Sequence, residues 1–233
     1  MIYTRKEIEN AVLIKDMLYQ RDIINYTGCC KEGQLYSEII AETVNKYIDD
    51  ASKNILAIPS IYLRTNFNFS SHIGKTNSNS EETFCRSLYT LQTPFGKAID
   101  YQINLIPGTR VNIDLMTYDE REDIATIVEV KGHRKSNGEI IESAETLLRC
   151  ILEIESYYRM LIKREKQFRK THVAGEGIYY LRKMKELRKG IYVPINSIAY
   201  AEYQEMEKGY RPHLAELWQK LNINFAAYNE TIE

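Results

Sequence analysis

The sequence predicts an α/β or α+β protein, because strand and helix patterns follow one another without a regular repeat along its 233 residues. Three runs with β-type alternation of apolar residues lie close together, at 98–106, 110–118 and 124–130, and short polar turns join them. An amphipathic stretch at 143–162 comes next, with apolar residues at helical spacing. A further β-type run follows at 191–200. The expected order is three strands in a meander, a helix and another strand.

The first third of the chain predicts a helical region. Apolar residues recur at helical spacing in 6–24 and in 35–51, with glycine-containing breaks between them. Residues 70–80 are rich in Ser, Asn and Gly, which predicts a loop or a domain boundary. We therefore divide the chain into a helical N-terminal region, residues 1–75, and a core, residues 76–233.

Further elements complete the expected core. Residues 81–91 predict a short helix before the meander, and the basic stretch after the long helix also reads as helical. Residues 211–221 predict another helix, and 223–228 a last strand.

The composition is that of a globular protein, with 44% hydrophobic and 27% charged residues. No apolar run approaches the roughly 20 residues that a membrane span requires, so we expect no membrane partner. The N-terminus has no apolar signal-peptide core, and we expect a cytoplasmic protein. The four cysteines show no metal-ligand spacing, so neither a disulfide nor a zinc site is expected.

Side-chain alternation brings two carboxylates and an ammonium onto one patch of the predicted sheet. In the second strand of the meander, the apolar residues on either side of Asp114 share one face, so Asp114 points to the other. In the third strand, Val128 and Val130 share one face, which leaves Glu129 and Lys131 together on the opposite one. A hairpin turn between the two strands then places Asp114 opposite the end of the third strand.

This patch has the chemistry of a divalent-cation site. Mg²⁺ prefers carboxylate and carbonyl oxygens, which Asp114, Glu129 and the Val130 carbonyl can supply. Mn²⁺ is an alternative. A bound cation lowers the pKa of a water and neutralises charge on a phosphate. Lys131 has no lone pair for the metal, so its expected role is to orient the attacking water or to stabilise the developing oxyanion.

The pattern resembles the PD-(D/E)XK nuclease superfamily: Asp114, then Glu129-Val130-Lys131 at the end of a β-branched strand, then a helix. The resemblance covers about residues 81–161, and the run at 191 would be the fourth core strand. It implies a restriction-endonuclease-like α/β core, with a central mixed β-sheet flanked by helices. It also implies Mg²⁺-dependent hydrolysis of phosphodiester bonds, with DNA as the expected substrate.

In that superfamily the helix before the meander often supplies a further catalytic acid. Glu82 matches this place best, and Glu81 is the near alternative. The residue before Asp114 is Ile113 rather than proline. The RecB-like branch carries Gln-xxx-Tyr on the following helix, where this chain has Glu153 and Tyr157.

Four polar residues recur every four positions on that following helix: Glu145, Arg149, Glu153 and Tyr157. This spacing predicts intrahelical ion pairs that face water or a neighbouring element. Glu153 would also be able to border the metal patch.

Positive charge is concentrated between residues 159 and 189, where eleven basic residues stand against three acidic ones, a local charge of +8. Such a segment either faces a polyanion or forms a solvated helix surface. The basic loop after Lys131 likewise either contacts a phosphate or is a solvated surface. The residues that we expect to contact nucleic acid are His133, Arg134, Lys183, Lys185 and Arg188.

The sequence therefore favours a metal-dependent nuclease. Two alternatives remain open: a catalytically inactive protein of the nuclease fold that binds nucleic acid, and a regulatory or assembly protein whose basic segment binds an acidic partner. A homodimer is possible for each of these functions.

Overall fold

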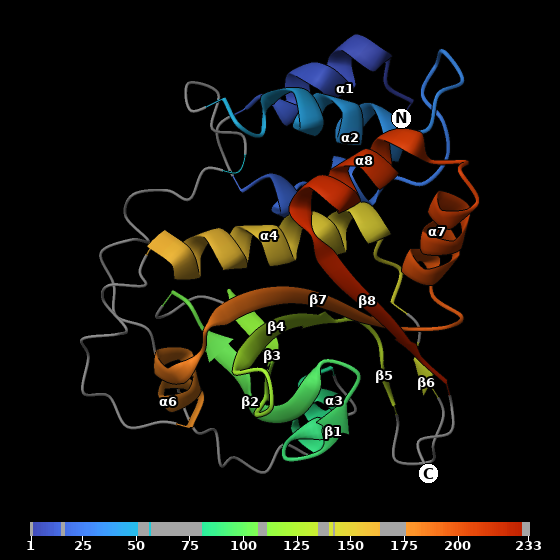
Figure 1. The fold of residues 1–233 in the computed structure, drawn as a ribbon. Coiled ribbons are helices and arrows are strands. Elements are labelled where there is room, and N and C mark those ends of the chain that lie inside the picture. The colour runs from blue at the N-terminus through green and yellow to red at the C-terminus, as the bar shows by residue number, and fades with distance from the viewer. Residues whose placement is uncertain are drawn as a thin grey trace.

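The computed structural model describes residues 2–14, 17–50, 56, 81–106, 111–134, 140–141, 143–163 and 176–229. Within these ranges the protein has an α/β architecture around a six-stranded sheet in the order β1-β2-β3-β4-β7-β8. Figure 1 shows α4 crossing one face of this curled sheet, and α3 lying on the other. The predicted loop at 70–80 and residues 164–175 of the basic segment lie outside the described residues.

The sheet is mixed, as predicted. From β1 to β4 neighbouring strands are antiparallel, whereas β4, β7 and β8 are parallel. A separate antiparallel pair, β5 and β6, follows β4. The strands are β1 Gln92–Thr93, β2 Gly96–Asn104, β3 Asn112–Asp119, β4 Ile124–Val130, β5 His133–Arg134, β6 Ile140–Ile141, β7 Glu186–Pro194 and β8 Ile223–Tyr228.

The described helices come in the predicted order, with α3 before the meander and α4 after it. None of them combines the length and apolar character that crossing a bilayer requires. The helices are α1 Arg5–Val12, α2 Tyr36–Tyr47, α3 Glu81–Leu88, α4 Leu147–Lys163, α6 Glu176–Lys183, α7 Ile198–Glu207 and α8 Pro212–Leu221.

The prediction of one long helix over residues 6–24 is wrong. α1 ends at Val12, and two 3₁₀ turns follow, at Leu18–Gln20 and Asp22–Asn25. Between these turns, the guanidinium of Arg21 donates to the backbone carbonyls of Ala11 and Ile14. Ala11 lies in the last turn of α1, where a helix leaves its last acceptors unsatisfied, and Ile14 follows the helix. Arg21 therefore stabilises the C-terminal end of α1 at this position.

The strand predicted at 191–200 is also misplaced. β7 begins five residues earlier, at Glu186, and ends at Pro194. The hydroxyl of Ser197 then accepts from the backbone N–H of Tyr200 and caps α7. A capped helix start so soon after Pro194 ends the extended conformation.

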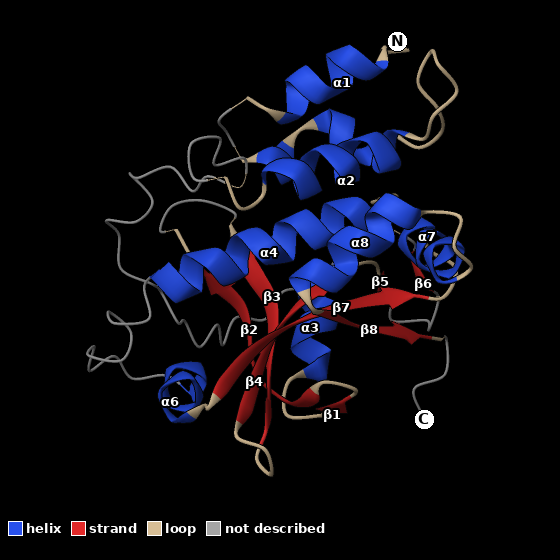
Figure 2. Cartoon of the chain, turned by 45° about the horizontal axis from the view of Figure 1, so that its top comes forward, coloured by secondary structure: helices blue, strands red, loops and turns tan. Residues whose placement is uncertain are grey.

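The hairpin register decides which face of the sheet carries the acidic residues. Leu115 lies opposite Val128, and both pack in a cluster with α3. The next pair, Met116 and Ile127, lies in the larger core that includes residues of α4. Asp114 lies two residues before Met116 in β3, and so on the same face of the sheet. It therefore faces α4, the helix above the sheet in Figure 2.

The N-terminal helices share this larger core. Figure 2 shows α1 and α2 stacked over α4 and α8, on the side away from the sheet. One continuous apolar cluster runs from Ile8 in α1 to Ile223 in β8. Packing therefore ties the first fifty residues directly to the layer that covers the sheet.

Candidate metal centre

Asp114, Glu129 and Lys131 come together at the carboxyl end of β4, as the sequence predicted. The Lys131 Nζ lies 2.5 Å from Glu129 Oε1. Asp114 Oδ2 accepts a hydrogen bond of 2.9 Å from the backbone N–H of Val130. All three side chains are buried, so their charges are largely removed from water.

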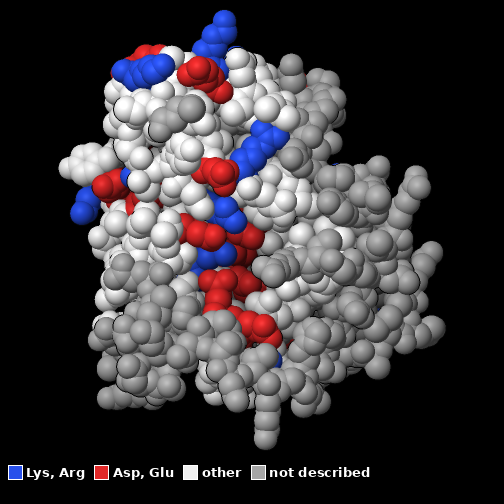
Figure 3. All heavy atoms as spheres, turned by 180° about the vertical axis from the view of Figure 1, so that it is seen from behind, with Lys and Arg blue, Asp and Glu red and all other residues white. Residues whose placement is uncertain are grey.

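Lys131 lies among further carboxylates. Its Nζ is 3.0 Å from Glu145 Oε2, 3.5 Å from Glu153 Oε2 and 3.9 Å from Glu81 Oε1. One ammonium thus lies within ion-pair distance of four carboxylates, contributed by α3, β4 and the region of α4. Acidic side chains also gather, with a few basic ones, over the middle of the face drawn in Figure 3.

The acid that α3 contributes is Glu81, not Glu82. The carboxylate of Glu82 instead pairs with Arg86 on the same helix, at 3.2 Å. Two acids of α2 make contacts away from the centre: Glu38 binds the first turn of α8, and Glu42 pairs with Arg5.

The polar stripe predicted for the helix after the meander faces the centre. α4 begins at Leu147, later than predicted, so Glu145 lies just before the helix and the other three residues of the stripe lie on it. The Arg149 Nε lies 3.1 Å from Glu145 Oε1 and 3.9 Å from Glu153 Oε2. The Tyr157 hydroxyl donates to Glu153 Oε1 at 2.7 Å, and its ring meets Tyr19 edge-on, with 5.7 Å between centroids. The four-residue spacing was visible in the sequence, but Glu145 was not predicted as a member of the site.

A second side chain that the sequence did not reveal is Gln102 in β2. Its Nε2 donates to Asp114 Oδ1 at 3.1 Å. The carboxylate of Asp114 is therefore held from two sides, by Gln102 and by the Val130 N–H.

The centre carries more negative than positive charge. With every group ionised, five carboxylates face two cations, a formal excess of three negative charges. Burial raises the pKa of Asp114 to about 6, although Lys131 opposes this shift. Burial, together with repulsion from Asp114, raises the pKa of Glu81 to about 8. The carboxylates are Glu81, Asp114, Glu129, Glu145 and Glu153, and the cations are Lys131 and Arg149.

The Lys131 ammonium is stabilised by this excess. Burial lowers the pKa of Lys131, but the attraction of the surrounding carboxylates, Glu129 foremost, outweighs burial and raises that pKa well above its usual value. Lys131 therefore remains charged across the physiological pH range.

Two carboxylate oxygens of the centre accept no hydrogen bond among the described residues, although Lys131 Nζ lies 3.5 Å from one of them, Glu153 Oε2. These oxygens, Glu129 Oε2 and Glu153 Oε2, are both buried. Buried acceptors without partners are costly, and a divalent cation would satisfy carboxylate oxygens of this kind. However, no three His, Cys, Asp or Glu side chains in the described ranges are arranged as a ready metal site.

Three of the predicted nucleic-acid contacts, Lys183, Lys185 and Arg188, do not lie beside the centre. The Lys183 and Lys185 Nζ atoms pair with Asp123 at 3.5 and 3.1 Å, and Arg188 pairs with Glu186 at 2.8 Å. In the parallel register, Glu186 lies beside Ile124 and Tyr192 beside Val130. At about 3.3 Å per residue, Glu186 and the two lysines before it lie roughly 20 Å or more from the centre along the strands, and Arg188 lies roughly 13 Å from it.

Other basic residues of the predicted contact set are placed differently. His133 and Arg134 form β5, close after Lys131 in the chain, but their side chains are outside the described part. Lys189, which contributes to the +8 segment, is buried and lies 2.6 Å from Glu155 Oε2. Part of the basic segment is therefore neutralised inside the core.

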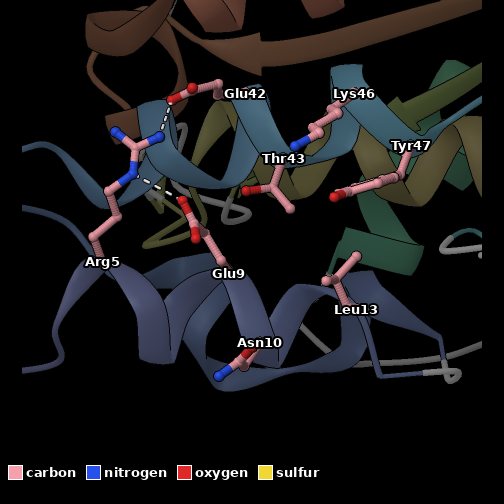
Figure 4. A pocket seen from close by; sticks show the side chains of 8 residues that line it. All are labelled: Arg5, Glu9, Asn10, Leu13, Glu42, Thr43, Lys46 and Tyr47. Atoms are coloured by element: carbon pink, nitrogen blue, oxygen red, sulfur yellow. Dashed lines mark hydrogen bonds and ion pairs between the residues drawn. The ribbon is translucent and has the colours of Figure 1, made fainter.

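A small pocket of about 170 Å³ lies between α1 and α2, well separated from the acidic residues of β3 and β4. Figure 4 shows the Arg5 guanidinium held between Glu9 and Glu42, with Lys46 and Tyr47 further along the wall. Its one central cation is already paired twice, and nothing in its lining extends the metal centre.

Comparisons with protein-family models, with curated proteins and with solved structures found no match for this chain.

Proposed function

We propose that this protein is a metal-dependent nuclease that hydrolyses phosphodiester bonds, with DNA as its substrate. The observation that carries the proposal is the convergence of Asp114, Glu129 and Lys131 at the end of β4, where Glu129 Oε2 is a buried oxygen that accepts no hydrogen bond in the described part of the chain. The order of helix, antiparallel meander, helix and parallel strand is the one that the PD-(D/E)XK resemblance implies. It supports a restriction-endonuclease-like core.

In this proposal, Asp114, Glu129 and the Val130 carbonyl hold Mg²⁺ or Mn²⁺, and Glu81 takes the place expected for Glu82. The cation, when bound, supplies positive charge for the phosphate and makes a nearby water more acidic. The protein's own contribution is to hold oxygen ligands in a buried setting, where charge interactions are strong.

Lys131 would act through its side chain while its backbone stays fixed. Its N–H donates to the Tyr192 carbonyl at 3.0 Å, and its carbonyl accepts from the Tyr228 hydroxyl at 2.8 Å. Once the carboxylates are shared with a divalent cation, the ammonium is free to donate to the attacking water or to a phosphate oxygen.

A second candidate is a catalytically inactive protein of this fold that binds nucleic acid or regulates a partner. The observation that favours it is the ion-pair geometry of Lys131, whose ammonium already lies among four carboxylates. In this candidate the lysine is a permanent counterion, and the cluster stabilises the fold rather than a transition state.

Incubation of the purified chain with plasmid DNA and with linear single-stranded DNA distinguishes the two. The nuclease should cut at least one substrate with Mg²⁺ or Mn²⁺, and both EDTA and Asp114→Asn should abolish cutting. Salt-sensitive DNA binding without cutting under any of these conditions would select the inactive binding protein.

A further inference from the structure

Three side-chain amides form a chain of hydrogen bonds that ends at Asp114. Asn104 Nδ2 donates to Asn112 Oδ1 at 2.8 Å. Asn112 Nδ2 donates to Gln102 Oε1 at 3.2 Å. Gln102 Nε2 then donates to Asp114 Oδ1 at 3.1 Å. The chain crosses three times between β2 and β3, on the face of the sheet that carries the acidic residues.

The charge of Asp114 determines the direction of the whole chain. An ionised carboxylate can only accept, so Gln102 must present its NH₂ group to Asp114. The oxygen of the same amide then faces Asn112, which must donate in turn. The orientation of each amide therefore follows from its neighbour, and successive bonds of one direction polarise and strengthen one another.

The backbone at Gln102 has an unusual conformation for a residue with a side chain. Its φ is +49°, in the left-handed region that normally favours glycine. The pairing of β2 with β3 also shifts register shortly before it, between Ala98 and Asp100. Strained conformations of this kind persist where the surrounding structure requires them, and they concentrate at functional sites.

We propose that Gln102 is a positioning residue for the metal centre, and that Asn112 and Asn104 hold its amide in place. The amide holds Asp114 Oδ1 while the Val130 N–H holds Oδ2, so the carboxylate plane cannot turn freely. Its remaining lone pairs then keep a fixed direction toward a cation shared with Glu129. This inference rests on the proposed metal-dependent function.

Gln102→Gly separates positioning from a purely structural role. It removes the amide but also relieves the left-handed backbone, because glycine tolerates positive φ. We expect Mn²⁺ affinity, measured by titration calorimetry on the full chain, to fall about tenfold or more, as is typical when a ligand loses its orienting partner. The Tm without metal should stay unchanged or rise. A structural role alone would lower the Tm and leave Mn²⁺ affinity unchanged.

Two further variants complete the test. Asn112→Leu keeps a similar shape but frees the Gln102 amide to turn, so it should lower Mn²⁺ affinity less than Gln102→Gly does. Asn224→Ala is the matched control, because among the described residues its amide bonds the Lys189 carbonyl in β7, and it should not change Mn²⁺ affinity.

Asp114→Asn shows which hypothesis fails if Gln102→Gly binds Mn²⁺ like the wild type. Should Asp114→Asn lose Mn²⁺ while Gln102→Gly keeps it, the positioning role is wrong and the metal centre stands. Should Asp114→Asn also bind Mn²⁺ normally, the proposed metal centre itself is wrong.

Discussion

Lys131 Nζ lies 2.5 Å from Glu129 Oε1 at the end of β4, and only 7% of Lys131 and 1% of Glu129 is exposed. Breaking a buried ion pair by removing one partner is strongly destabilising, because it leaves an uncompensated charge. The same carboxylate is the proposed metal ligand. If the proposed function holds, the ammonium and a divalent cation would compete for Glu129, and a bound cation would release the lysine from that carboxylate.

Lys131→Met tests this competition. Removal of the ammonium should raise Mn²⁺ affinity, because no internal cation then occupies the carboxylates. Cleavage should nevertheless fall by about 100-fold or more, roughly 2.7 kcal/mol of transition-state stabilisation. Calorimetry and a plasmid-nicking assay measure the two effects. Lys97→Met is a control, because Lys97 is exposed on β2. Normal cleavage by Lys131→Met would exclude a catalytic role for the lysine, and weaker Mn²⁺ binding would exclude competition.

Asp114→Asn should lose Mn²⁺ affinity and cleavage together, because a neutral amide is a poor ligand for a hard cation. DNA binding should persist or improve, since one negative charge facing phosphate is gone. The Tm in EDTA at about pH 8 should not decrease, because burial raises the pKa of Asp114 to about 6 and makes its charged form costly there. Filter binding, calorimetry and thermal unfolding together check these outcomes.

The stability of the metal-free protein should fall as pH rises from about 5.5 to about 8.5. Burial raises the pKa of Asp114 to about 6 and of Glu81 to about 8, from 3.8 and 4.5. A carboxyl whose pKa is higher in the folded state stabilises that state at pH values below its unfolded pKa. This contribution is lost as pH rises through the folded pKa.

Thermal unfolding in EDTA across this range measures the loss. Mg²⁺ should restore the Tm near the upper end of the range and have little effect near the lower end, because the cation binds only deprotonated carboxylates. Glu81→Gln should flatten the upper part of the profile. Its side chain is about one third exposed, so the change should be modest. A metal-free Tm that rises steadily toward pH 8.5 would contradict the prediction.

The strands of the candidate centre could be predicted because alternation is a local property of an extended chain. β4 has the predicted bounds, 124–130, and its two faces separate Val128 from Glu129 as expected. The choice between Glu81 and Glu82 could not be made in the same way. Successive helical residues differ in direction by about 100°, and α3 begins at Glu81 itself, so too little periodic pattern precedes it to fix the facing side.

The start of β7 was not predicted, because its first residues are charged. Glu186, Arg188 and Lys189 look like part of a solvated basic helix, yet Lys189 is buried against Glu155. That partner lies 34 residues earlier in the chain, and no local sequence pattern indicates this contact. The amide chain at Gln102 was unpredictable for the same reason, because it depends on cross-strand register and on one left-handed backbone angle.

The basic residues at the amino ends of β4 and β7 give a prediction about duplex length. Combined replacement of Lys183, Lys185 and Arg188 by Ala should reduce the log–log salt slope of DNA binding by about 0.9 for each lost phosphate contact. The roughly 20 Å from Lys183 and Lys185 to the centre corresponds to about six base pairs at 3.4 Å each. Long duplexes should therefore lose affinity, whereas very short ones should not. An unchanged slope would assign these residues to the solvated surface.

The last prediction concerns the hydrogen bonds that join α2, near the N-terminus, to α8, near the C-terminus. Glu38 in α2 accepts hydrogen bonds from the backbone N–H groups of His213 and Leu214, at 2.9 and 3.0 Å. Arg211, which precedes α8, makes no side-chain cap of its own, so Glu38 replaces a local cap from 175 residues away. Loss of a helix cap costs about 1–2 kcal/mol, which for a chain of this size lowers the Tm by roughly 2–8 °C.

Glu38→Ala should show that decrease in Tm, and Glu42→Ala is its matched control one turn further along α2. Glu42 pairs with Arg5 at 2.6 Å, but 40% of its side chain is exposed, and a surface ion pair contributes at most about 1 kcal/mol. Because α8 also packs in the core that Ile8 and Ile40 share, a fragment of residues 76–233 should fail to unfold cooperatively in calorimetry. If Glu38→Ala and Glu42→Ala proved equally stable, or if that fragment unfolded like the full chain, the N-terminal region would be an independent addition rather than part of the layer that holds α4 over the metal centre.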